Sequence, residues 1–293
     1  MYYIIYPIFY MLSLLPWRVL YFISDGIYGL IYYVFGYRRK VVMSNLLIAF
    51  PEKTEKERTR IAKEFYHNFI DTFIETIKLI SISDKEFDKR CSLDAGELNE
   101  LFATGINAQV FTGHFFNYEF ANLAFARFAR IPLVFVYMPL GNKTFNKIIV
   151  DIRKRYGSIL LSATEFKHKF KEMVPDHYAL GLAADQNPGS PDNAYWLPFF
   201  NKMTPFIPGP EKGAKKNNMP CIFGHFYKEK RGYFKFELEI MTLTPNEFET
   251  GQITKLYVAH LEKAIRRKPA NYLWSHRRWK REFDQEKYGH LVV

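Results

Sequence analysis

Short apolar runs alternate with amphipathic segments from about residue 106 onward. Continuous apolar runs are typical of buried strands, and apolar residues three and four apart are typical of helices. The predicted strands cover residues 108–113, 132–138, 158–162, 178–184, 219–227 and 233–241. The predicted helices cover residues 117–130, 144–157, 165–173 and 247–267. This alternation predicts an α/β fold with a mixed, mostly parallel central sheet flanked by helices.

A longer helix is predicted before this region, over residues 51–80. Thr54 can cap it, and Glu57 three positions later completes a capping box. Apolar residues recur four apart and are expected on one buried stripe: Ile61, Phe65, Phe69, Phe73 and Ile77. Residues 84–105 are polar and mixed, which predicts a connector with a short helix.

The N-terminus is strongly apolar, since residues 2–35 carry only the charges of Arg18 and Asp25. Each uncharged run is shorter than the ~20 residues of a membrane-spanning helix. The segment therefore predicts a helical membrane anchor: one tilted span, a re-entrant pair, or helices lying in the membrane interface. A helix pair buried in a soluble protein is the alternative. We expect residues 1–40 to form this membrane-associated segment and residues 41–293 to form a single α/β domain.

The chain is basic, with 41 Lys and Arg against 30 Asp and Glu, a net charge of +11. This balance favours an anionic partner such as an anionic membrane surface, an acidic protein or nucleic acid. The basic residues 38–40 directly after the apolar segment place that side in the cytoplasm. Residues 271–282 interleave basic residues with Trp274 and Trp279, which suits a membrane or nucleic-acid strip. No recognition-helix pattern accompanies the strip, so nucleic acid is not expected as a partner.

Two cysteines, Cys91 and Cys221, stand apart from any CxxC or Cys/His cluster. No metal site and no disulfide framework are predicted.

Candidate chemistry follows two of the predicted strands. His114 comes directly after residues 108–113, and Asp185 with Gln186 comes directly after residues 178–184. Sites in such sheets collect beyond the carboxyl ends of strands. An imidazole is a suitable general base near neutral pH, and Glu119 in the first turn of the next helix is predicted to orient it. Turn formation is the alternative for the Asp185 loop.

Residues 196–216 combine aromatic residues with four prolines and predict an irregular apolar loop. It either walls a groove for an acyl chain or packs against the sheet. A helix is expected to start near Pro210.

Six ordered features together resemble one family. They are the apolar N-terminal anchor, "GYRRKVVMSNLLIAFPE" (36–52), the His-x4-Glu box at 114–119, Asp-Gln at 185–186, "LPFFN" (197–201) and "YLWSHRRWK" (272–280). In these segments the chain resembles the bacterial lipid A biosynthesis acyltransferases of the lauroyl/myristoyl type, within the lysophospholipid acyltransferase superfamily. The resemblance covers nearly the whole chain and implies a glycerolipid acyltransferase-like fold.

The resemblance implies transfer of a fatty acyl chain from an acyl thioester, carried by acyl carrier protein or coenzyme A, to a hydroxyl of a membrane lipid. No other cofactor is implied. His114 would be the general base and Glu119 its partner, while Asp185 would help position the histidine or the acceptor. The implied location is the cytoplasmic side of the bacterial inner membrane.

Further residues are expected to contact substrate. The oxyanion donor is expected from a backbone N–H near His114, from Arg153 or from Arg155. The remaining substrate-binding candidates are Gln186, Phe199, Phe200, Arg277 and Arg278.

Two positions depart from the family pattern: Met138 stands where relatives often have Arg, and "PFIPGPEKG" replaces a Thr-rich turn. The alternatives are therefore acylation of another membrane lipid (a lysophospholipid or an aminolipid) and a non-catalytic lipid-binding protein.

Overall fold

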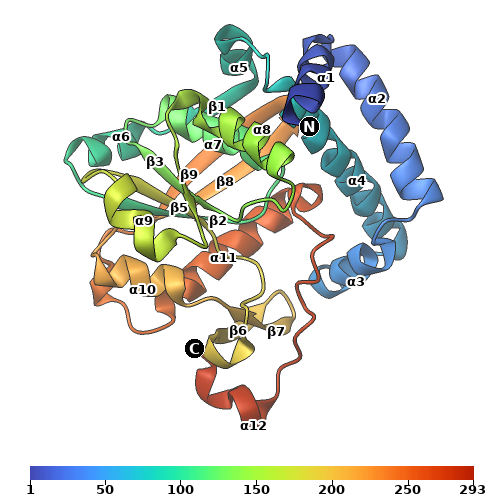
Figure 1. Ribbon diagram of the computed structural model, residues 1–293. Helices are drawn as coiled ribbons and strands as arrows, with labels where there is room; N and C mark the ends of the chain where they lie inside the picture. The colour runs from blue at the N-terminus through green and yellow to red at the C-terminus, as the bar shows by residue number, and fades with distance from the viewer.

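A seven-stranded sheet forms the centre of the computed structural model, which describes residues 1–293 apart from the side chains of Glu97 and Lys167 (Figure 1). The strand order is β1-β9-β8-β2-β5-β3-β4. Five of the six pairings are parallel, and only β8 with β9 is antiparallel. The strands are β1 (Cys91–Asp94), β2 (Ala108–Thr112), β3 (Leu133–Tyr137), β4 (Ile159–Ser162), β5 (Ala179–Ala183), β8 (Cys221–Lys230) and β9 (Tyr233–Thr242). The prediction of a mixed, mostly parallel sheet is confirmed.

Helices cover both faces of this sheet (Figure 1). Alternate residues of β2 point to opposite faces, so Phe111 joins one core cluster and Val110 the other. The Phe111 side is covered by α3 (Arg39–Ala49), α4 (Glu55–Lys78), α10 (Gly209–Lys216) and α11 (Gln252–Arg267). The Val110 side is covered by α5 (Asp84–Arg90), α6 (Gly96–Ala103), α7 (Tyr118–Phe128) and α8 (Lys143–Arg153). Two further helices are α9 (Phe166–Met173) and α12 (Gln285–Tyr288).

Three details of the fold differ from the sequence prediction. Residues 196–216 are not one irregular loop, because β6 (Tyr195–Phe199) and β7 (Lys202–Phe206) form an antiparallel pair before α10. Prolines at 198 and 205 argue against strands in a large sheet, yet a two-stranded sheet tolerates them at its edges. Residues 84–105 hold two helices and a strand.

The third detail is α4. Its capping box between Thr54 and Glu57 is confirmed. The predicted stripe is only partly buried, since Phe65 is buried and Phe73 is 55% exposed. Residues four apart advance 400° around a helix, so a long stripe drifts off the core face. Ile70 and Ile74 take the buried positions instead.

The apolar N-terminus forms α1 (Tyr2–Leu14), α2 (Trp17–Gly29) and a π-helical turn (Leu30–Val34) that lie along α4 (Figure 1). No single helix is long and apolar enough to cross a membrane. The two together meet that requirement in length and composition, with a bend of 114° between them. Large apolar side chains in this region remain more than half exposed: Met1, Tyr3, Ile4, Met11, Leu14, Phe22, Leu30, Tyr33, Val34 and Phe35.

Buried charges fasten these helices to the rest of the fold. Asp71 on α4 is 1% exposed and accepts hydrogen bonds from Ser24, Lys228 and Arg231, each at 2.7 Å. Arg231 also binds Asp25 on α2, at 2.6 Å. Burial acts to raise the pKa of Asp71, but the bonds and charges of Arg231 and Lys228 outweigh it and hold that pKa below its ordinary value. The cluster joins α2, α4 and the β8–β9 turn.

Replacing Arg231 tests this attachment. Arg231→Gln removes the guanidinium between Asp25 and the buried Asp71, so we expect a loss of about 1–2 kcal/mol in the free energy of unfolding and faster amide exchange in α2. Lys169→Gln breaks the exposed i,i+4 pair with Glu165 and is the control, with an expected loss below about 0.5 kcal/mol. Equal stability and equal exchange in both variants would show that the cluster does not hold α2.

Candidate active site

The strand register brings two loops together at one edge of the sheet. In the parallel pair β2–β5, Thr112 lies opposite Ala183. His114 and Asp185 each follow two residues later, so both leave the sheet side by side at its carboxyl edge. The sequence prediction that these positions share one edge is confirmed.

A short hydrogen bond joins the two side chains. His114 Nδ1 lies 2.6 Å from Asp185 Oδ1, and the His114 backbone N–H donates to Asp185 Oδ2 at 3.0 Å. The Asp185 side chain is 1% exposed, whereas 28% of the His114 side chain is exposed. The carboxylate is therefore buried beneath a ring that reaches solvent.

The two side chains shift each other's pKa in opposite directions. Burial acts to raise the pKa of Asp185, but the charge and hydrogen bonds of His114 outweigh it and lower that pKa to about 2. Burial likewise acts to lower the pKa of His114, and the charge and hydrogen bond of Asp185 outweigh it and raise that pKa above its ordinary value. An ionised carboxylate only accepts hydrogen bonds, so Nδ1 of His114 carries the proton. The neutral ring then keeps an unprotonated Nε2 available as a base.

The structure differs from the prediction at Glu119. Its carboxylate does not bind His114 but is held by Arg153, whose Nε and Nη2 donate to Glu119 Oε2 and Oε1 at 2.7 and 2.8 Å. Glu119 lies in the first turn of α7, and Arg153 ends α8, which packs against α7. Glu119 and Arg153 are 2% and 8% exposed, and a buried carboxylate is most stable beside such a two-pronged partner.

The C-terminal segment closes the site from one side. The Leu273 N–H donates to the His114 carbonyl at 3.1 Å, and the Phe116 N–H donates to the Asn271 carbonyl at 2.9 Å. The buried Tyr272 hydroxyl adds a hydrogen bond that lowers the pKa of Asp185. The predicted strip at residues 271–282 is therefore only partly on the surface, because Asn271, Tyr272, Trp274, Arg278 and Trp279 are buried, whereas Arg277 and Lys280 are exposed.

Several predicted substrate-binding residues are already occupied by protein contacts. Arg155 binds Asp84 at 2.8 Å and has no contact with His114 among the described residues. Phe199 and Phe200 belong to the main core and pack on Trp279, so these two rings of the β6–β7 hairpin pack inward. Gln186 is partly exposed beside Asp185.

The two C-terminal arginines separate. Arg277 is exposed, whereas Arg278 is 1% exposed and donates to the Pro205 carbonyl at 2.9 Å and to Asn187 Oδ1 at 3.3 Å. Its guanidinium also lies 4.3 Å from the centre of the Phe206 ring.

Sequence reasoning missed the support behind this site. Buried Asn117 donates to Glu75 Oε2 at 3.2 Å, and Tyr21 on α2 donates to Glu75 Oε1 at 3.0 Å. His276 lies 3.0 Å from the Asn187 amide, next to the Asp185 loop. In the sequence, only the position of Asn117 between His114 and Glu119 pointed to these supporting residues. Among the described residues, no group of three His, Cys, Asp or Glu side chains could hold a metal ion.

Comparison with known families identifies the family of the chain. The family described as bacterial lipid A biosynthesis acyltransferase matches residues 1–281. The chain belongs to this family. Membership implies an acyltransferase and indicates acyl transfer in lipid A biosynthesis. A search of curated proteins gave no match.

The His114–Asp185 pair of this lipid A acyltransferase family member can be tested by titrating His114. In Asp185→Asn the ring loses the charge that raises its pKa, so we expect the His114 pKa to fall. Glu119→Gln leaves the His114–Asp185 bond intact and should change that pKa far less. The measurement is an NMR titration of the imidazole. A larger fall in Glu119→Gln than in Asp185→Asn would mean that Glu119 orients the ring after all.

Proposed function

We propose that the protein transfers a fatty acyl chain from an acyl thioester to a hydroxyl of a membrane lipid, with lipid A or its precursor as the acceptor. The observation that carries the proposal is the His114–Asp185 pair. It combines a buried, ionised carboxylate with a partly exposed imidazole that is bound to this carboxylate through Nδ1. This arrangement fixes the tautomer and presents Nε2 as the base.

The chemistry follows from that tautomer. Nε2 of His114 takes the proton of the acceptor hydroxyl as its oxygen attacks the thioester carbonyl carbon. Asp185 stabilises the imidazolium that forms. When the tetrahedral intermediate collapses, the carbon–sulfur bond breaks and the imidazolium returns the proton to the leaving thiolate. The products are an ester and a thiol.

The developing oxyanion needs a hydrogen-bond donor. The backbone N–H groups of His114, Phe115 and Phe116 already donate to Asp185, Gly113 and Asn271. Arg153 binds Glu119 through Nε and Nη2, which leaves Nη1 for another acceptor. We therefore favour Arg153 as the donor, with Glu119 holding the guanidinium in place.

The proposed partners are anionic or apolar. The net charge of +11 suits an acyl thioester on the acidic acyl carrier protein, or on coenzyme A, as well as an anionic membrane surface. The exposed apolar side chains of α1, α2 and the π-helical turn support docking on a membrane. The basic residues 38–40 that follow support the cytoplasmic side of the inner membrane.

Transfer of labelled acyl chains to lipid acceptors tests the reaction. Membranes containing His114→Ala should retain folded, attached protein and lose activity by about 10²- to 10⁴-fold, because the base is absent. His168→Ala, at an exposed position on α9, is the control and should be as active as the wild type. Equal transfer by wild type and His114→Ala would exclude His114 as the base.

Membrane docking is tested separately by flotation with anionic vesicles. Phe22 and Phe35 are 80% and 71% exposed, so Phe22→Asp/Phe35→Asp replaces two rings that would enter the bilayer. We expect vesicle binding to fall at least about tenfold. Leu243→Asp, at a 48% exposed residue after β9, is the control and should bind as the wild type does. Undiminished binding of the folded double variant would mean that another surface docks.

A further inference from the structure

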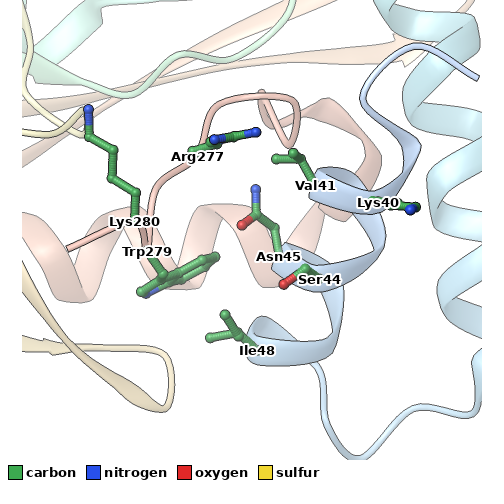
Figure 2. A pocket seen from close by; sticks show the side chains of 8 residues that line it. All are labelled: Lys40, Val41, Ser44, Asn45, Ile48, Arg277, Trp279 and Lys280. Carbon is green, nitrogen blue, oxygen red and sulfur yellow. The ribbon is translucent and has the colours of Figure 1, made fainter. Parts of the chain in front are cut away.

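A groove separates α3 from the C-terminal segment (Figure 2). Its volume is about 340 Å³, which lies in the range of small-molecule sites. Its walls combine three cations with three apolar side chains: Lys40, Arg277 and Lys280, with Val41, Ile48 and Trp279. Figure 2 shows α3 on one side, Arg277, Trp279 and Lys280 on the other, and Asn45 reaching across between them.

Charge in this groove is unbalanced. Lys40, Arg277 and Lys280 are all exposed. No aspartate or glutamate is among the described residues that line it. An arginine offers a planar fork that matches phosphate oxygens, and lysines add compact positive charge. A phosphomonoester, with up to two negative charges, complements three cations better than a single carboxylate does.

The groove is part of the same assembly as the proposed active site. Asn45 donates to the carbonyls of Trp274 and His276 at 2.7 and 2.8 Å, which fixes α3 against the segment. Asn187, two residues after Asp185, donates to the Arg277 carbonyl at 2.9 Å. These hydrogen bonds attach the groove wall to the loop that carries Asp185.

Its surroundings indicate a lipid rather than a soluble anion. Tyr33, Val34 and Phe35, which are 63%, 68% and 71% exposed, precede Lys40 by only a few residues. A bilayer in contact with those side chains would bring headgroups to the level of the groove. Docking of a whole acidic protein needs about 800 Å² on each partner, far more than this groove presents.

We propose that this groove binds the phosphate-bearing headgroup of a membrane lipid, and that this lipid is the acyl acceptor. Arg277 and Lys280 contact the phosphate, Lys40 adds charge at the membrane side, and Trp279 with Ile48 contacts the apolar part of the headgroup. The identification with the acceptor rests on the proposed function, whereas headgroup binding does not.

The test uses the full chain in neutral detergent micelles that contain fluorescent phosphatidic acid, a phosphomonoester lipid. Diacylglycerol with the same label is the comparison. The wild type should bind phosphatidic acid roughly tenfold more tightly than diacylglycerol. Arg277→Ala/Lys280→Ala should lose this preference. The control Lys171→Ala/Lys216→Ala removes the same charge at exposed positions on α9 and α10 and should retain it.

Three outcomes would overturn the proposal. One is a lipid preference that persists in the folded Arg277→Ala/Lys280→Ala variant. Another is displacement by free glycerol 3-phosphate at the same concentration as the lipid, which would assign the groove to a soluble anion. The third is an Arg277→Ala/Lys280→Ala variant that keeps its lipid preference but loses affinity for acyl carrier protein, which would make the surface a protein-docking site.

Binding is read without turnover, so the two proposals fail separately. His114→Ala should bind phosphatidic acid as the wild type does. If the wild type binds phosphatidic acid but transfers no acyl chain, only the proposed function is excluded. If the wild type transfers acyl chains and the Arg277→Ala/Lys280→Ala variant keeps the preference for phosphatidic acid, only the headgroup site is excluded.

Discussion

A buried carboxylate that stays ionised is the constraint on which the site depends. Asp185 is almost fully buried at the carboxyl edge of the sheet, where an isolated charge is costly. It remains charged because His114 donates to it from both the ring and the backbone. These two hydrogen bonds fix the orientation and the tautomer of the His114 ring, and they hold the loop after β2 in place. The loop is then fixed from the other side by residues 271–273, so the C-terminal segment becomes part of the site.

The same physical requirement recurs on α4. Asp71 and Glu75 are each 1% exposed, one turn apart, and each takes its hydrogen bonds from other elements. Asp71 is bound by α2 and the β8–β9 turn, whereas Glu75 is bound by α2 and by Asn117 between His114 and Glu119. A single helix therefore connects the apolar N-terminal helices to the loop of the candidate base. This arrangement gives a physical reason why the exposed apolar side chains of α1 and α2 keep a fixed position relative to the candidate active site.

Much of the fold was predictable because it rests on local patterns. Apolar runs and amphipathic periods identified six strands of the central sheet and the helices between them. The short β1 escaped prediction because it pairs with β9, far along the chain. The strands β6 and β7 pair with each other, and they escaped prediction because Pro198 and Pro205 argue against strands. Phe73 on α4 was misplaced because a spacing of four residues drifts around a helix.

By itself the sequence determined six strands of the central sheet, the edge at which His114 and Asp185 lie, and the family to which the chain belongs, because apolar runs and family motifs are properties of short segments. Only the tertiary structure decided the partners. Glu119 is five residues from His114, yet it binds Arg153, which lies 34 residues further along the chain, while the distant Asp185 binds the ring. The tertiary structure also separated the neighbours Arg277 and Arg278, since Arg277 lines a groove and Arg278 is buried in the core. Burial sets these choices, since a buried charge must take whichever partner the packing brings within hydrogen-bond distance.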